Sequence, residues 1–256
     1  MSNQNVNWNP DWDKVSSEAN LLNEAEGGHL YRMESAYLVV LNGEYRQMGR
    51  QYGLLLGEQL KQIRQLIIDE FITRDGIRYE SIRDMIGTPF YLARPRRHKE
   101  LLAGISEVTG IDIIELTVID DMVCIEGIAR MSGGAAQCTS AAVWGKMSRD
   151  GATYTGRNHD LQMNWRDRLP ELGAFLVMNP AGSDYSIAAP TQIGMVSAFL
   201  DVMNSAGLYM EVNNAAATLG MYMYSNRASI LNNLCNIALS YGSAEELAQT
   251  KYFTKS

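Results

Sequence analysis

The sequence has few of the residues that most often hold metals or form disulfide frameworks. Its 256 residues include only three cysteines and three histidines. The cysteines show no spacing typical of zinc or redox motifs, and their odd number argues against a disulfide framework. The histidines are far apart, so a histidine-based zinc site is disfavoured, and a cysteine–histidine catalytic pair would have to use His159. We expect no cofactor. The cysteines are Cys124, Cys138 and Cys235, and the histidines are His29, His98 and His159.

Long apolar runs and an excess of positive charge are also lacking. No run approaches the roughly 18 apolar residues that a membrane span needs, and the first residues do not have the pattern of a signal peptide. The net charge of -7 argues weakly against a nucleic-acid partner, and the basic cluster at 94–99 is typical of a solvated helix start. A hydrophobic content of 46% with 20% charged residues is typical of a soluble globular protein. We therefore expect a cytoplasmic protein that binds neither nucleic acid nor membrane.

The residues before about position 137 are patterned mainly as helix. Apolar residues recur every three or four positions from 44 to 72, which is typical of an amphipathic helix with one buried face. Thr109-Gly110-Ile111-Asp112 indicates a helix stop followed by a new N-cap. The pattern predicts an early strand at 36–42 and helices at 44–72, 78–87, 96–109 and 112–131.

The residues after position 137 are patterned mainly as strand. Asn179-Pro180-Ala181-Gly182 and Asn204-Ser205-Ala206-Gly207 are typical of turns. Strands connected by hairpins and accompanied by helices indicate an α+β fold, in which helices cover an antiparallel sheet. We expect 1–137 and 138–256 to be two parts of one domain. The predicted strands lie at 139–146, 152–159, 173–179, 184–189, 194–203 and 207–214, and a helix pair lies between about 226 and 252.

Three glycines form a stripe on the predicted helix 44–72. Gly49, Gly53 and Gly57 follow one another at a spacing of four residues. Glycine costs up to about 1 kcal/mol in a helix relative to alanine. The stripe therefore predicts a close approach of another element to this face.

Residues 137 to 160 combine a hairpin with chemically reactive side chains. Cys138-Thr139-Ser140 begins one predicted strand, Asp150-Gly151 is a hairpin signal, and Gly156-Arg157-Asn158-His159-Asp160 ends the next strand. If the two strands pair, Cys138 lies beside Arg157, Asn158 and Asp160. Such a cluster is suited to activating a thiol.

This arrangement resembles the choloylglycine hydrolase and acyl-coenzyme A:6-aminopenicillanic acid acyltransferase group of the N-terminal nucleophile (Ntn) hydrolases. Three further segments, 42–53, 102–110 and 203–214, are similar to that group in the same order. The resemblance implies a four-layer αββα sandwich with a largely helical N-terminal pro-segment. Beyond the region that corresponds to the helix pair at 226–252, family members have several more strands, and this tail carries a substrate-binding arginine. We therefore expect the C-terminal strands to be missing here.

In this family the cysteine becomes the first residue of a chain, and the resemblance implies that autoproteolysis between Gln137 and Cys138 does this here. Its free α-amine then serves as the general base, so no histidine is required. The family usually has glycine before the cysteine, and glutamine reaches strained backbone angles less easily. The resemblance implies that Arg157 favours the thiolate, that Asp160 holds the α-amine, and that Asn213 or Asn214 donates to the oxyanion.

The resulting prediction is a self-processing cysteine amidase or acyltransferase of the penicillin acylase type. Its partner would be a small linear amide with a hydrophobic acyl group, and a homo-oligomer is allowed. A conjugated bile salt hydrolase is one alternative, and a non-catalytic relative or binding subunit is another. Several aromatic residues either line an acyl pocket or pack in the core, among them Trp144, Tyr185, Phe199 and Tyr209.

Overall fold

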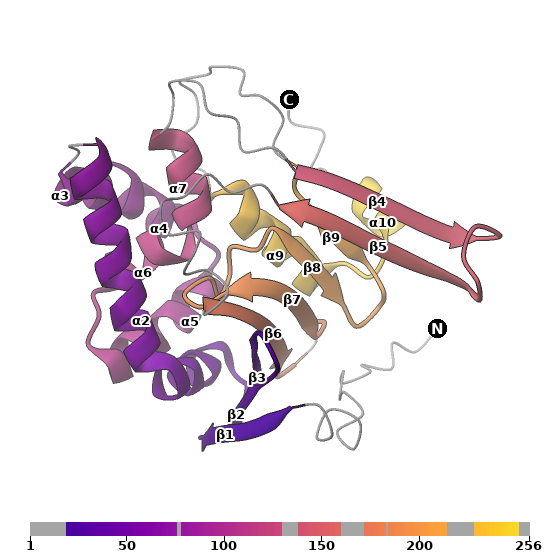
Figure 1. The fold of residues 1–256 in the computed structure, drawn as a ribbon, viewed down its shortest axis with the longest axis horizontal. Helices are drawn as coiled ribbons and strands as arrows, with labels where there is room; N and C mark the ends of the chain where they lie inside the picture. The colour runs from indigo at the N-terminus through magenta and orange to yellow at the C-terminus, as the bar shows by residue number, and fades with distance from the viewer. Residues whose placement is uncertain are drawn as a thin grey trace.

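A mixed sheet forms the centre of the described part of the chain (Figure 1). This computed structural model describes residues 19–75, 78–129, 138–159, 172–182, 184–213 and 228–250. The sheet has seven strands in the order β1-β2-β3-β6-β7-β8-β9, and a separate hairpin pairs β4 with β5. The strands are β1 (Asn20–Ala25), β2 (Gly28–Arg32), β3 (Tyr37–Gly43), β4 (Cys138–Gly145), β5 (Gly151–His159), β6 (Gly173–Pro180), β7 (Ile187–Gln192), β8 (Asp201–Asn204) and β9 (Tyr209–Glu211). The α+β class is thus confirmed.

The sequence predicted an antiparallel sheet, but the sheet in the structure is mixed. Strands β3 and β6 pair in parallel, from Tyr37 opposite Ala174 to Gly43 opposite Pro180. The other strand pairs of this sheet are antiparallel. Parallel neighbours need a long crossover connection. The connection from β3 to β6 contains the helices between β3 and β4 and then the β4–β5 hairpin. It is long enough for the chain to return to the same end of the sheet, so β6 runs in the same direction as β3.

The helices agree with the sequence pattern most closely where local signals mark their ends. The predicted helix 96–109 is α5, because Gly110 ends it in a left-handed conformation with φ 72°. Asp112 then caps the next helix by accepting from the backbone of Ile114 and Glu115. The helical elements are α2 (Tyr45–Asp75), α3 (Tyr79–Ile82), a π-helical segment (Arg83–Gly87), α4 (Thr88–Ala93), α5 (Arg96–Thr109), α6 (Ile113–Asp120), α7 (Met122–Ala129), α9 (Ile230–Ser240) and α10 (Ala244–Ala248).

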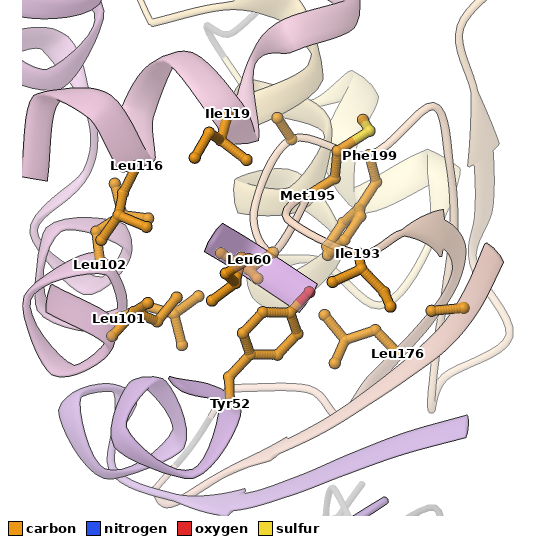
Figure 2. Close-up of a cluster of buried hydrophobic side chains, with 14 of the residues drawn as sticks. Tyr52, Leu60, Leu101, Leu102, Leu116, Ile119, Leu176, Ile193, Met195 and Phe199 are labelled. Carbon is orange, nitrogen blue, oxygen red and sulfur yellow. The ribbon is translucent and has the colours of Figure 1, made fainter. Parts of the chain in front are cut away.

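The main core lies between the helices and one face of the sheet. Tyr52 of α2 is buried at its centre, and its hydroxyl accepts a hydrogen bond of 2.8 Å from the backbone N–H of Gly194. Figure 2 shows Tyr52 beside Leu176 of β6 and Ile193. The opposite face of the sheet carries a smaller buried cluster that includes Leu38, Val40 and Val177. Alternate residues of β3 and β6 thus pack on opposite sides.

The predicted close approach to the glycine stripe is made by α5. A Cβ placed on Gly49 would lie 2.0 Å from the carbonyl oxygen of Leu101, and one on Gly104 would lie 2.1 Å from that of Arg46. Two helix backbones therefore touch at Gly49 and Gly104. At Gly57 a Cβ would meet only a methyl group of Thr109, at 3.7 Å.

A buried ionic cluster interrupts the single helix that the sequence predicted at 112–131. Arg94 forms ion pairs with Asp120, which ends α6, and with Asp121, which separates α6 from α7; all three side chains are at most 1% exposed. The Asp120 carboxylate also accepts from the backbone N–H groups of Val196 and Ser197. Because the backbone of residues 196–198 turns its N–H groups towards this carboxylate, the strand predicted at 194–203 is reduced to β8.

The hairpin β4–β5 extends away from the body of the molecule, beyond β8 and β9 (Figure 1). Val143, Trp144 and Tyr154 are exposed on it. Its base, where β4 begins and β5 ends, contacts the residues that flank β8 and β9 through hydrogen bonds from Arg157. This junction brings together the side chains considered next.

Candidate functional site

The hairpin register places the predicted thiol and the predicted arginine on one side. Cys138 lies opposite His159, and Ser140 lies opposite Arg157. Side chains alternate along a strand, so Cys138, Ser140 and Arg157 share a face of the hairpin. The expectation that the start of the first strand and the end of the second meet at one edge is therefore confirmed.

Arg157 is the centre of the hydrogen-bond network at this edge. Its Nη2 donates to Cys138 Sγ at 3.0 Å and to the carbonyl oxygen of Val212. Its Nη1 donates to Asp201 Oδ1 at 2.7 Å and to the carbonyl oxygen of Leu200 at 3.0 Å. The Arg157 side chain is only 6% exposed. Burial alone would lower the pKa of Arg157, but its hydrogen bonds to Asp201 and Cys138 outweigh this effect and raise it, so the guanidinium stays charged.

A second group of polar side chains lies on β9 and just after it. Asn213 Nδ2 donates to Ser140 Oγ and to Glu211 Oε1, both at 2.9 Å. The Tyr209 hydroxyl is 2.9 Å from Glu211 Oε2 and 3.2 Å from Asp201 Oδ1. The pKa of Glu211 is lowered, chiefly by a hydrogen bond from Ser140, with Tyr209 and Asn213 adding to this effect. An ionised Glu211 therefore orients the Asn213 amide, which contacts Ser140, the second residue after Cys138 on β4.

Of the predicted site residues, the structure brings Cys138, Arg157 and Asn213 together. Asn158 is exposed on β5. Gln137, Asp160 and Asn214 lie outside the described residues. Phe199 is fully buried in the main core rather than at this edge, and Trp144 is 63% exposed. The other two thiols are separate from the site, and burial raises the pKa of Cys124 to about 12 and also raises that of Cys235.

Three residues of this edge were not predicted from the sequence as individual site residues: Asp201, Glu211 and Ser140. One available signal is the alternation of Tyr209, Glu211 and Asn213, which places three polar side chains on one face of a strand. Another is Asp201, a carboxylate between the apolar residues Leu200 and Val202. A charged residue inside an apolar strand needs a partner, and Arg157 is that partner.

No protein-family model and no curated protein matches this chain. Within the described ranges, His, Cys, Asp and Glu side chains do not gather in groups of three or more that could hold a metal ion. Over the same residues, no helix combines the length and the apolar character that crossing a membrane requires. The candidate site therefore rests on its own geometry.

Proposed function

We propose that the protein is an N-terminal nucleophile hydrolase or acyltransferase that cleaves a linear amide of a hydrophobic acyl group through a thioester on Cys138. The observation that carries this proposal is the contact of 3.0 Å between Arg157 Nη2 and Cys138 Sγ. A buried guanidinium beside a thiol is the kind of environment that stabilises a thiolate. Cys138 is also the first residue of β4, so cleavage before it would leave its amine at the site.

In the proposed mechanism, cleavage of the bond between Gln137 and Cys138 frees an α-amine with an ordinary pKa of about 7.7–8.0. This amine accepts the thiol proton, and the sulfur attacks the substrate carbonyl carbon. The tetrahedral intermediate collapses as the amine product leaves with the proton, and the acyl group remains on sulfur. Water, or an acceptor amine in the acyltransferase case, then attacks the thioester and regenerates the thiol. In autoproteolysis the same sulfur attacks the Gln137 carbonyl carbon, and the amide bond to Cys138 breaks as its nitrogen takes up the thiol proton. Water then hydrolyses the resulting thioester and regenerates the thiol.

Asn213 is the proposed side-chain donor to the oxyanion, a contact worth roughly 3 kcal/mol in the transition state. Both hydrogens of its Nδ2 are engaged in this structure, one by Ser140 and one by Glu211. The substrate oxyanion would replace Ser140 as an acceptor, because the bond to this neutral hydroxyl is the weaker of the two. The bond to the Glu211 carboxylate is charge-assisted and would be kept. Asp160 is proposed to hold the α-amine, and Asn214 is the alternative oxyanion donor.

The proposed fold is an αββα sandwich in which residues 1–137 form the pro-segment and first chain. Two features support it. The β4–β5 hairpin is separate from the seven-stranded sheet, as a strand pair of a second sheet would be. The second face of the main sheet carries apolar side chains of its own on β3 and β6.

The test is amide turnover by Cys138→Ala, with Cys124→Ala as the matched control. Cys138→Ala should lose at least about a thousandfold in rate and should not self-process, whereas Cys124→Ala should keep both activities. Retained activity in Cys138→Ala would rule out the proposal. Substrates should include a phenoxyacetyl amide and a taurocholate-like amide, because their relative rates separate the acylase from the bile salt hydrolase. A wild-type protein inactive on both would favour the non-catalytic alternative.

A further inference from the structure

All four outer hydrogens of the Arg157 guanidinium are engaged. A guanidinium has five N–H donors in a fixed planar fork, of which four are on the two Nη atoms. Three of these four point to oxygen atoms of Leu200, Asp201 and Val212, and the fourth points to Cys138 Sγ. Since the fork is rigid, three occupied oxygen contacts fix the direction of the fourth hydrogen.

Asp201 differs from the other two oxygen partners because it is charged. Leu200 and Val212 offer neutral carbonyl groups, whereas the Asp201 carboxylate accepts at 2.7 Å in a charge-assisted bond. The pair is sheltered from solvent, with side chains 6% and 15% exposed, so salt screens it weakly. Asp201 also lies opposite Glu211 in the β8–β9 pair and 3.2 Å from the Tyr209 hydroxyl, which hold it in place.

We propose that Asp201 is a positioning residue for the nucleophile, which holds the Arg157 guanidinium so that one Nη2 hydrogen points at Cys138 Sγ and stabilises the thiolate. The structure gives Asp201 no direct hydrogen bond to Cys138 among the described residues, so it acts through Arg157. The titratable groups that face Arg157 in this part of the structure are Cys138 on β4, Asp201 on β8 and Glu211 with Tyr209 on β9. Arg157 is therefore the cation among these four acidic side chains.

The test measures alkylation of Cys138 by iodoacetamide as a function of pH. The thiol loses its proton to water, the thiolate carbon–sulfur bond forms, and iodide leaves. Asp201→Ala should slow this reaction at neutral pH about three- to tenfold, because a misplaced Arg157 leaves less of the thiol in the thiolate form. The loss is limited to this range because a thiolate without the cation is more basic and therefore somewhat more nucleophilic. The pH at half-maximal rate should also rise. Asp201→Asn keeps an oxygen acceptor for the Arg157 guanidinium, so it should react faster than Asp201→Ala.

The coupling between the two residues distinguishes positioning from general support of the fold. Arg157→Met should slow alkylation at least as much as Asp201→Ala, and the double variant should be no slower than Arg157→Met alone. Additive losses in the double variant, or an unchanged pH profile in Asp201→Ala, would overturn the proposal.

The chain contains its own control for folding. Cys235 is fully buried and burial disfavours ionisation of both Cys124 and Cys235, so neither should be labelled while the protein is folded. Peptide mass spectrometry resolves the three thiols. If Asp201→Ala exposes all of them, Asp201→Glu replaces it: this variant keeps the charge but displaces the oxygens, and it should react more slowly than Asp201→Asn. Equal rates would contradict the proposal.

The inference rests on the proposed function for its catalytic meaning, yet the alkylation assay needs no amide substrate. Loss of thiol reactivity in Asp201→Ala, in a protein without amide turnover, would refute the proposed function and leave the positioning role standing. Amide turnover that Asp201→Ala leaves unchanged would refute the positioning role alone.

Discussion

Replacing Gly49 with alanine should destabilise the protein although alanine is the better helix former. The added Cβ would lie 2.0 Å from the Leu101 carbonyl oxygen and 3.1 Å from the Gly104 Cα, whereas ordinary contacts begin at 3.4 Å. These atoms belong to the α5 backbone and cannot rotate away, so α2 and α5 must separate. Overpacking costs about 1–3 kcal/mol or more, and the helix propensity of alanine returns about 1 kcal/mol. Because the clash is with backbone at 2.0 Å, we take the upper end of this range, about 3 kcal/mol, and expect a net loss of about 2 kcal/mol in the free energy of unfolding.

Two other glycines of the same stripe provide matched controls. At Gly53 the Cβ would lie 2.4 Å from a methyl group of Val108, and the nearest backbone atom, the Ile105 carbonyl oxygen, is 3.3 Å away. Gly53→Ala should therefore lose less than Gly49→Ala, whose Cβ meets backbone at 2.0 Å. At Gly57 the nearest atom is 3.7 Å away, so Gly57→Ala should be neutral or stabilising by up to about 1 kcal/mol. Urea unfolding followed by far-UV circular dichroism measures all three. Equal effects at the three positions, or the largest loss at Gly57, would refute the backbone contact between α2 and α5.

Two further predictions concern the buried polar residues near α5. Arg94→Met should cost about 3–5 kcal/mol in urea unfolding, because it leaves the carboxylates of Asp120 and Asp121 buried without their cation; a loss below 1 kcal/mol would contradict this. Burial lowers the pKa of His98 to about 4, so the stability due to its neutral form is complete above pH 6.5 and is lost as pH falls towards 4. The slope of the free energy of unfolding against pH should approach at most about 1.4 kcal/mol per pH unit. His98→Gln should flatten this slope, and an unchanged slope would show that other groups cause it.

The elements that the sequence predicted well are those defined by local signals. Helix α5 begins after Pro95 and ends at Gly110, and both ends were predicted because proline and left-handed glycine act on their own neighbours. The buried face of α2 followed from its apolar spacing alone. The sequence did not predict the β1–β2 hairpin, which turns at Glu26 and Gly27 with positive φ angles and has largely exposed residues on β1.

The elements that the sequence predicted wrongly depend on distant partners. The apolar run 112–131 contains Asp120 and Asp121, whose partner Arg94 precedes them by 26 and 27 residues. No local pattern indicates that both carboxylates turn towards one arginine and break the helix. The same cluster draws the N–H groups of Val196 and Ser197 to Asp120, and this prevents the long strand predicted at 194–203.

The candidate site shows the same division. Cys138 and Arg157 could be placed together because one hairpin fixes their register. Asp201 is separated from Arg157 by 44 residues and lies in another sheet, so its role depends on how the hairpin docks on β8 and β9. Period-two patterning marks Glu211 and Asn213 as sharing a face, but it does not say which element that face meets.

The most direct test of the proposed function is the intact mass of the purified protein under denaturing conditions, with Cys138→Ala measured beside it. We expect two wild-type chains, residues 1–137 and residues 138–256 beginning at Cys138, and one uncut chain for Cys138→Ala. A wild-type protein that remains a single chain, like the variant, would contradict the claim that Cys138 becomes an N-terminal nucleophile.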